Sequence, residues 1–404
     1  MKIADVILVA LLLAGSSAKA QFVNTGQILF VGDSGLLYVD ADYLHHSGKV
    51  LNKGIMVANK DWSNEDSNSS VFTSESTGEV QLNGADQVIG GQFKTTFPNL
   101  SLSGIDYKKL ETDADVAGQL FLNDREFRAE GYTLSVLSSD PEAIQRTSGF
   151  ISTDKSGKLL RNLNSPGAYL FPLGSYIKAS GINLYRPVKV TAKNSSSNTF
   201  SLSLLPEDPG LSGYDRESKK EDVKNISDKY FYRVSQNSGN SGADFKFFKS
   251  TVEDGNEDQV VVWNALSIWE KETCKSTDGM FGDGLDRYIA YHNTDVLQNT
   301  PISFATSEQT VAANEDISIY NAFSPDGDNK NDTWKIKNID LYPENSLVIV
   351  NRWGDEVYKA TGYTNNRAWD GGNLASGTYF YALDVNVMGK KKIYKGFITL
   401  IKRD

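Results

Sequence analysis

Short apolar runs, each ended by glycine, asparagine, aspartate or serine, recur along most of this chain. From residue 21 to about residue 140 they return roughly every ten to twenty residues, and clear examples cover residues 27–31, 35–39, 54–58, 117–122 and 131–137. Runs of this length suit β-strands, and none of them shows the apolar spacing of an amphipathic helix. We therefore predict an all-β protein with almost no helix.

Two architectures fit residues 21–140: a parallel β-helix, or a sandwich of β-hairpins. Turns of unequal length that carry similar short strands suit the stacked coils of a solenoid. No glycine or asparagine repeat in the region is strict, so the pattern is loose. We favour a solenoid-like N-terminal region.

The remainder of the chain divides by composition. Residues 141–180 form a transition segment, and residues 181–305 alternate apolar and polar positions as strands do, which predicts a β-sandwich. The polar residues 306–316 suit a linker. Residues 317–404 contain roughly seven short strands with turn residues between them, which predicts an immunoglobulin-like sandwich.

The first 20 residues have the pattern of a secretory signal peptide. Lys2 precedes an apolar run at residues 6–14, and the small-residue site at residues 18–20 suits cleavage before Gln21. The run is too short to cross a bilayer, and no later apolar segment approaches the length that a membrane-spanning helix needs. No cysteine follows the run, so a lipid anchor there is not expected.

Charge and cysteine content limit the partners. The formal net charge is −10, which argues against nucleic acid as a partner. Cys274 is the single cysteine, so no intramolecular disulfide can form. A small, partly buried role for Cys274 is the expected one, in preference to a nucleophile. We expect no cofactor.

Several motifs stand in order within residues 317–404. Residues 321–332 read Asn-Ala-Phe-Ser-Pro-Asp-Gly-Asp-Asn-Lys-Asn-Asp, and an Asn-Arg-Trp-Gly turn, a Trp-Asp-Gly and a Gly-Thr-Tyr follow. The motif positions are Phe323, Pro325, Asp328, Asn331, Asp332, Asn351, Arg352, Trp353, Gly354, Trp369, Asp370, Gly371, Gly377, Thr378 and Tyr379. In order and spacing they resemble the gliding-motility-associated C-terminal domain, the type B sorting domain of Bacteroidetes type IX secretion.

That resemblance implies an export address. The implied partners are the type IX translocon and an outer-membrane barrel protein of the PorP/SprF type, and the implied destination is the cell surface or the medium, after passage through the periplasm. We expect the motif residues to form a folded surface, with Trp353 anchoring either that surface or the core beneath it. Gly354 would let the turn close, and residues 397–401 would lie at a sheet edge.

The acidic loop at residues 326–332 invites a calcium interpretation. Counted from Asp326, however, Lys330 and Lys337 stand at positions where an EF-hand needs oxygen ligands, so the loop is not an EF-hand. Two interpretations remain: an irregular calcium loop using Asp326, Asp328 and Asp332, or a turn in which these side chains cap the local backbone. We favour the turn.

Other candidate sites are weaker. The pairs Asp113 with Asp115 and Asp283 with Asp286 offer the two carboxylates of glycoside hydrolysis, although solvated turns give the same letters far more often. Adjacent residues on a strand point to opposite faces, so His45 and His46 cannot share one metal ion. The tryptophans at positions 263 and 269 suit core packing better than sugar stacking.

Together these features predict a non-enzymatic protein of the cell surface, for adhesion, surface structure or gliding motility, with a glycan or a protein as its ligand. The competing hypothesis is a surface polysaccharide-active enzyme, a hydrolase or lyase, with its site on residues 21–140. Acids or cations clustered on one exposed face of that region would distinguish the two.

Overall fold

The computed structural model describes residues 20–402, except residues 27, 68–69, 178–181, 195–196, 308–316, 329, 343 and 388–389. The predicted signal peptide lies outside the described residues apart from Ala20, and so does most of the predicted linker. The chain divides into two compact units, residues 1–305 and 306–404. Among the described residues no helix is long and apolar enough to cross a membrane.

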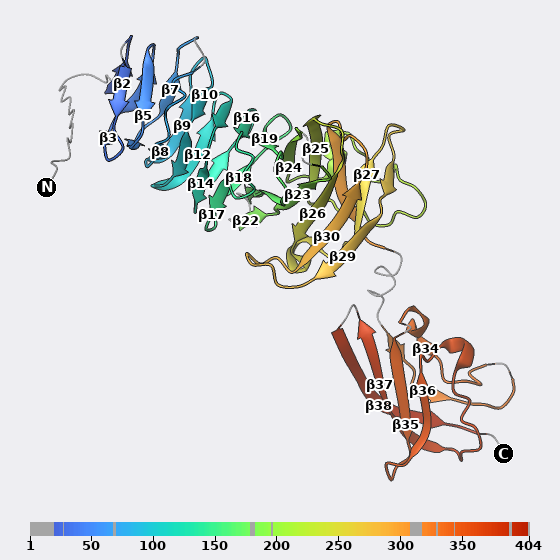
Figure 1. Ribbon diagram of the computed structural model, residues 1–404. Helices are drawn as coiled ribbons and strands as arrows, with labels where there is room; N and C mark the ends of the chain where they lie inside the picture. The colour runs from blue at the N-terminus through green and yellow to red at the C-terminus, as the bar shows by residue number, and fades with distance from the viewer. Residues whose placement is uncertain are drawn as a thin grey trace. The chain divides into compact units, whose positions relative to one another are not determined.

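Residues 21–174 form a parallel β-solenoid of about seven turns, which confirms the solenoid predicted for residues 21–140. The successive turns lie side by side in Figure 1, from blue at β2 to teal at β19. One stack contains β1 (Gln21–Asn24), β4 (Asp42–His45), β7 (Trp62–Asn64), β9 (Ala85–Gly90), β12 (Ile105–Leu110), β15 (Glu126–Arg128), β18 (Phe150–Ser152) and β21 (Leu173–Ile177). A second contains β3 (Leu36–Val39), β6 (Ile55–Ala58), β8 (Glu79–Leu82), β11 (Asn99–Leu102), β14 (Leu120–Asn123) and β17 (Ile144–Arg146). A third side contains β2 (Ile28–Val31) and β5 (Lys49–Asn52), and then β10 (Thr95–Phe97), β13 (Ala114–Val116), β16 (Thr133–Val136) and β19 (Lys158–Asn162).

The turns of the solenoid are unequal in length. Tyr43 pairs with Trp62, 19 residues on, and Trp62 pairs with Ile89, a further 27 residues on. Parallel pairing fixes which residues stack but leaves the loops between strands free to vary. The variable loops explain why the sequence shows no strict period.

Aromatic rings stack inside the solenoid. The ring centroids of Tyr43 and Trp62 are 4.0 Å apart, and Trp62 lies 5.2 Å from Phe97 in the next turn. The indole N–H of Trp62 donates to Thr95 at 3.0 Å, so its polar atom is satisfied in the interior. All three rings are fully or almost fully buried. These stacked interior rings connect the first turns of the solenoid.

Three glycines stack on one another at one corner of the solenoid and form a glycine column. Gly35, Gly54 and Gly78 precede β3, β6 and β8, and each stacks on the one before it. A Cβ at Gly54 would overlap the carbonyl oxygen of Gly35, and a Cβ at Gly78 would overlap that of Gly54. Only glycine allows backbones to approach this closely at the corner.

Parallel pairing continues beyond residue 140. Ile151 of β18 pairs in parallel with Leu173 of β21, so the segment 141–180, expected as a transition, supplies the last turns of the solenoid. The pairing then becomes antiparallel: β21 meets β22 (Ile182–Tyr185), and β19 meets β24 (Thr199–Leu205). These strands cover edges that would otherwise offer unpaired backbone groups.

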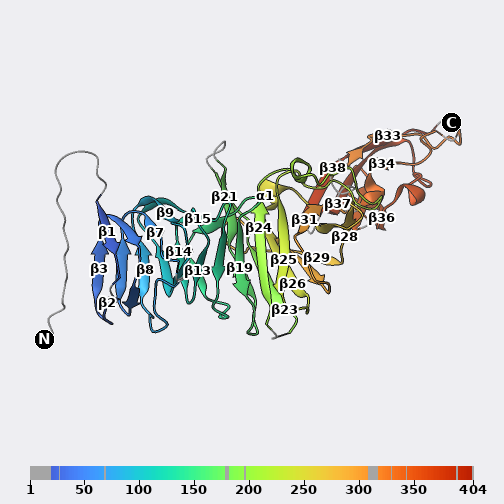
Figure 2. The same ribbon diagram turned by 90° about the horizontal axis from the view of Figure 1, so that it is seen from above.

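In the middle region a continuation of one solenoid sheet packs face to face against a separate sheet, and Figure 2 shows these strands following the solenoid without a break. One continues from β19 and β24 through β25 (Phe231–Ser238), β31 (Thr300–Ala305), β27 (Gln259–Trp263) and β28 (Trp269–Lys271). The other has the order β20 (Tyr169–Phe171), β23 (Val188–Ala192), β26 (Ala243–Lys249), β30 (Arg287–Asn293) and β29 (Cys274–Asp278). Phe247 joins the two, with ring centroids 5.1 Å from Tyr232 and 5.5 Å from Phe304.

Helix is almost absent from the described residues, as predicted. The first unit holds α1 (Thr251–Asp254) and the 3-10 turn η1 (Pro209–Ser212). Arg186 is buried beside α1, where it forms an ion pair with Asp254 at 2.6 Å. The hydroxyl of Tyr230 also donates to Asp254, at 2.9 Å, so this buried charge pair has the hydrogen bonds that it needs.

The described residues of the second unit form seven strands, five in one sheet and two in another. The larger sheet has the order β33 (Ala322–Phe323), β38 (Lys390–Leu400), β37 (Gly377–Val387), β35 (Asn345–Val350) and β36 (Glu356–Thr361). The smaller sheet pairs β32 (Ser318–Ile319) with β34 (Ile336–Lys337), and two 3-10 turns are η2 (Ile339–Leu341) and η3 (Asn365–Arg367). This unit has a separate hydrophobic core.

Candidate functional site

A tight turn joins β35 to β36 and carries the Asn-Arg-Trp-Gly motif. The side-chain oxygen of Asn351 accepts hydrogen bonds from the backbone N–H groups of Trp353 at 2.9 Å and Asp355 at 3.0 Å. Its amide nitrogen donates to the Asp355 carboxylate at 2.9 Å. Gly354 has φ of 91°, a conformation that penalises any residue with a Cβ. The motif therefore specifies a rigid turn.

That turn presents an exposed tryptophan. The side chain of Trp353 is 75 % exposed, and the guanidinium of Arg352 lies 4.6 Å from its ring centroid. Of the two positions expected for Trp353, on the surface or in the core beneath, the structure shows the surface. Tryptophan and arginine are the residues most enriched where protein interfaces gain their binding energy.

Other motif residues build the core. The ring of Trp369 lies 5.3 Å from that of Phe323 and 5.8 Å from that of Tyr379, and all three are buried. Gly371 has φ of 81°, and a Cβ there would lie 2.9 Å from Leu400. These four motif positions hold the sheets together, which differs from the expectation that the motif as a whole forms a surface.

Two central core residues were absent from the motif positions named from the sequence. The hydroxyl of Tyr363 donates to the carbonyl of Trp334 at 2.5 Å and accepts from the backbone N–H of Trp369 at 2.9 Å. Trp334 and Tyr363 are both buried, and burial raises the pKa of Tyr363. The tryptophan at position 334 is itself a signal in the sequence, since aromatic residues bury a large area and dominate core energetics.

The remaining motif residues shape loops and strand starts. Asp370 accepts a hydrogen bond from the backbone N–H of Gly372 at 2.9 Å, and the carbonyl of Asn331 accepts one from Ser324 at 2.9 Å. Pro325 is half-buried beside the acidic loop, whereas Gly377 and Thr378 are exposed where β37 begins.

Three carboxylates gather in the acidic loop. An oxygen from each of Asp326, Asp328 and Asp332 lies within 4.8 Å of the others, and no other group of this kind exists among the described residues. The loop also uses these side chains internally: Asp332 accepts from the N–H of Gly327 at 2.8 Å, and Asp328 accepts from that of Lys330 at 2.8 Å. Such bonds are typical of an Asx-rich turn, which supports our preferred interpretation.

Residues 317–400 match the family of the CHU_C type IX secretion signal domain. The C-terminal unit is a type IX secretion signal domain. The protein is therefore exported by type IX secretion and interacts with that machinery. The family match does not extend to residues 1–316. No curated protein and no solved structure matches the chain.

The last strand of the signal domain, β38, is paired on both sides near its C-terminal end. Thr399 and Leu400 of β38 pair with β33 on one side and with β37 on the other. The expectation that residues 397–401 lie at a sheet edge is therefore wrong for these two residues. The short β33 covers the end of β38 because the chain re-enters the sheet there before the acidic loop.

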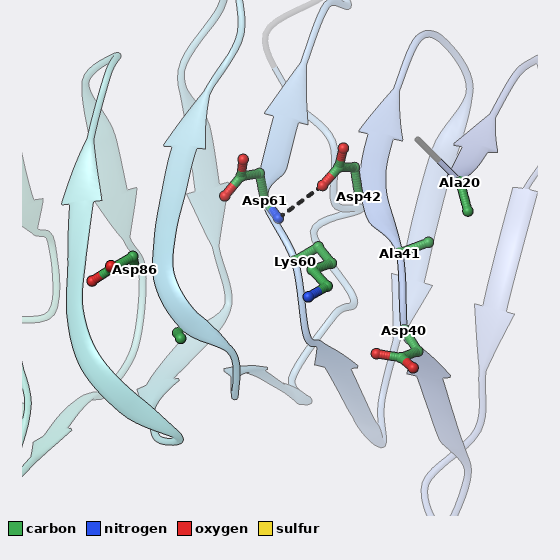
Figure 3. Close-up of a pocket in the computed structure, with 8 residues that line it drawn as sticks. Ala20, Asp40, Ala41, Asp42, Lys60, Asp61 and Asp86 are labelled. Carbon is green, nitrogen blue, oxygen red and sulfur yellow. Dashed lines mark hydrogen bonds between the residues drawn. The ribbon is translucent and has the colours of Figure 1, made fainter. Parts of the chain in front are cut away.

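In the first unit, acidic side chains line a pocket of about 460 Å³ on the solenoid (Figure 3). Asp40, Asp42, Asp61 and Asp86 contribute the carboxylates, and Lys60 the single cation. Asp42 accepts a hydrogen bond from the N–H of Asp61 at 3.3 Å, drawn as the dashed line in Figure 3. Asp61 in turn accepts from the N–H of Val88 at 2.9 Å. The carboxylates thus connect successive turns of the solenoid.

The acid pairs named from the sequence are engaged in local structure. Asp115 forms an ion pair with Lys94 at 2.6 Å, and Asp113 accepts from the N–H of Thr133 at 2.8 Å. Asp283 pairs with Arg146 at 2.8 Å. Asp286 accepts from the N–H of Thr251 at 2.7 Å, and although burial alone would raise its pKa, the hydrogen bonds from Thr251 bring the pKa below its usual value.

The histidines, Cys274 and the tryptophans also have structural surroundings. His45 is fully buried and His46 is exposed, so the pair points to opposite faces. Cys274 is partly buried, and burial raises the pKa of its thiol, which disfavours the nucleophilic thiolate. Trp269 is fully buried, with its ring 5.3 Å from that of Trp263.

Proposed function

We propose that the protein acts outside the outer membrane as a non-enzymatic surface or secreted protein, in adhesion, surface structure or gliding motility. In this proposal residues 1–20 are a signal peptide that delivers the chain to the periplasm, and the signal domain then directs it through the type IX translocon. An outer-membrane barrel protein of the PorP/SprF type is the proposed partner at the surface. The exposed Trp353 beside Arg352 supports a docking role for the turn between β35 and β36.

An exposed apolar patch on the first solenoid turn carries the adhesive part of the proposal. Ile28 and Phe30 on β2 are 70 % and 62 % exposed and share one face of the strand, and these two residues define the patch. On a different side of the solenoid, Leu36, Tyr38 and Ile55 on β3 and β6 are also exposed. Large apolar side chains exposed side by side often mark contact with a partner. The patch suits contact with another protein or an apolar surface.

The adhesion test replaces two residues of the patch. We expect Ile28→Ser with Phe30→Ser to lower attachment of displaying cells several-fold, while the amount of protein on the cell surface stays unchanged. Leu211→Ser is the matched control, because Leu211 is 73 % exposed and lies on η1, outside the patch. Attachment equal to the wild type at equal display would refute the adhesive role of the patch.

The acidic pocket of Figure 3 favours a second candidate function, a polysaccharide hydrolase. Paired carboxylates are what glycoside hydrolysis needs, and Asp42 and Asp61 both line this pocket. A panel of polysaccharides assayed for hydrolase and lyase activity tests this candidate. Turnover of any substrate that Asp61→Asn abolishes, with the fold intact by circular dichroism, would replace the non-enzymatic proposal with this one.

A further inference from the structure

The outer face of the sheet that contains β23, β26 and β30 carries two lysines side by side. Lys189 of β23 pairs in register with Lys246 of β26, and both side chains are exposed on that face. Like charges directly opposite one another on neighbouring strands destabilise a sheet. Among the described residues neither ammonium forms an ion pair with a carboxylate, so an anion supplied from outside would relieve the repulsion.

An aromatic floor adjoins the two lysines. Phe248 and Tyr288 are paired across β26 and β30, and Phe281 folds over them from the loop before β30. The ring centroid of Phe281 lies 5.5 Å from that of Phe248 and 5.2 Å from that of Tyr288. The lysine ammonium groups lie against these rings, Lys246 at 4.9 Å from Tyr288 and Lys189 at 6.0 Å from Phe248. Cation–π attraction holds the charges over the floor.

The loop that carries Phe281 has a fixed conformation that holds this ring over the aromatic floor. Gly282, Asp283 and Gly284 all have positive φ, of 80°, 50° and 74°. The N–H of Phe281 donates to the carbonyl of Leu285 at 3.0 Å, which fixes the loop at its narrow end. Asp283 also forms an ion pair with Arg146 at 2.8 Å, which ties the loop to the last turns of the solenoid.

These elements enclose a pocket of about 400 Å³ with an excess of positive charge. Its charged residues are Arg146, Lys189, Lys246 and Asp283, and Arg146 neutralises the single carboxylate. Two lysine charges remain uncompensated in a protein whose net formal charge is −10. Because the rest of the protein is acidic, it would repel polyanions in general, and this local positive site would attract only an anionic group that fits the pocket.

We propose that this pocket binds an acidic sugar, a uronate unit of a polysaccharide. The apolar C–H face of a pyranose ring would stack on Phe248, Phe281 and Tyr288, and its carboxylate would lie between the ammonium groups of Lys189 and Lys246. Charge-assisted hydrogen bonds of this kind are roughly twice as strong as neutral ones. The inference deepens the proposed surface role by naming a ligand class for the first unit, and it does not depend on the signal domain.

Calorimetric titration of the purified protein with tetragalacturonate tests the proposal. The matched neutral probe is the methyl ester of the same oligosaccharide, which keeps the rings and removes the charges. We expect saturable binding of the acid and at least about tenfold weaker binding of the ester, since a hydrogen bond to a charged group contributes on this scale. Equal affinity for acid and ester, or no saturable binding, would overturn the proposal.

Variants locate the site. Lys189→Gln with Lys246→Gln should weaken binding of the acid at least about tenfold, because it removes both charged contacts. Phe281→Ala should weaken the acid and the ester together, which leaves the preference for the acid unchanged. The matched control, Lys53→Gln with Lys158→Gln, removes two lysines from the solenoid and should bind as the wild type does.

The remaining outcomes also decide the question. Wild-type affinity in the Lys189 and Lys246 double variant would refute the site, and that variant should fold, since it removes a like-charge pair. Binding of oligothymidylate in preference to the uronate would refute the sugar and indicate single-stranded nucleic acid. Surface display of each variant, measured separately, reports on the signal domain, so a failed sugar titration leaves the export proposal standing.

Discussion

The solenoid and the signal domain use sequence in opposite ways. In the solenoid each strand contacts the strands one turn before and after it, as Tyr43 contacts Trp62, so the contacts follow the order of the chain. In the signal domain the core joins positions farther apart in the chain, such as Phe323 with Trp369 and Phe323 with Leu400. The solenoid therefore tolerates insertions between strands, whereas the signal domain requires particular residues at particular positions.

The difference explains which region a family pattern can recognise. Solenoid positions need only an apolar residue inward and room at the corner, so many sequences satisfy them. The signal domain needs Gly371 beneath Leu400, Asn351 at its turn and Trp369 in its core. Each of these requirements restricts a position to one type of residue. The residue type alone does not reveal its structural role, because Trp353 is exposed whereas Trp369, also a tryptophan of the motif, is buried.

The strongest test of the comparison separates the two units. Deletion of residues 317–404 should abolish delivery to the cell surface and leave the first unit folded in the periplasm, because that unit has its own hydrophobic core. Cell fractionation and protease accessibility measure the location, and circular dichroism measures the fold. Normal surface levels of the truncated protein would contradict the export role.

The reciprocal experiment joins residues 317–404 to an inert reporter behind a signal peptide. The fusion should reach the surface, and a reporter without the domain should remain in the periplasm.

Next in size is the contrast between Trp353 and Trp369, two of the three tryptophans of the signal domain. Trp369→Ala should lower the free energy of unfolding of that domain by about 3–5 kcal/mol, because it empties a core position between Phe323 and Tyr379. Trp353→Ala should change stability by no more than about 0.5 kcal/mol, since the ring is 75 % exposed. Chemical denaturation of both variants measures the difference. Similar losses in the two would contradict the assigned roles.

Trp353→Ala should nevertheless reduce surface delivery, since we assign it to docking. Delivery at the wild-type level, together with unchanged stability, would remove Trp353 from the proposed docking surface.

A smaller effect tests the glycine column of the solenoid. Gly78→Ala should destabilise the first unit by about 1–3 kcal/mol, because the new methyl group would overlap the carbonyl of Gly54 and force the turns apart. Gly32→Ala is the control: its new Cβ would meet only the ring of Phe30, at 3.7 Å, which is ordinary contact. Thermal unfolding of the two variants measures the difference, and equal melting temperatures would show that the turns separate at no cost.

The smallest expected effect is a pH dependence within the solenoid. Burial lowers the pKa of His45, partly opposed by Asp66 at 3.6 Å, whereas an unfolded histidine titrates near about 6.5. As the pH falls below that value, the unfolded chain takes up a proton that the folded chain refuses, so stability decreases. The free energy of unfolding should therefore be lower at pH 5.5 than at pH 7.5.

The His45→Gln variant should lose correspondingly less stability over the same pH interval, measured by urea denaturation at each pH. His46→Gln, at an exposed position, should follow the wild type. An identical pH dependence in the wild type and His45→Gln would show that another group is responsible.

The sequence by itself indicated the all-β class and the secretion signal domain, and it favoured the solenoid over a sandwich of hairpins. It could do so because strand-length apolar runs are local, and because the turn at Asn351 and the motifs around it depend on backbone constraints that few residues satisfy. The sequence also indicated that His45 and His46 diverge, which follows from strand geometry alone.

Only the tertiary structure decided which motif residues are buried, where the solenoid ends, and which charges meet. The sequence placed the transition at residue 141, yet parallel pairing continues to Gly174, because pairing depends on what the neighbouring turn offers. Lys189 and Lys246 are 57 positions apart and meet only because β23 and β26 are paired in register. Contacts between distant residues depend on register and topology, which no local pattern specifies.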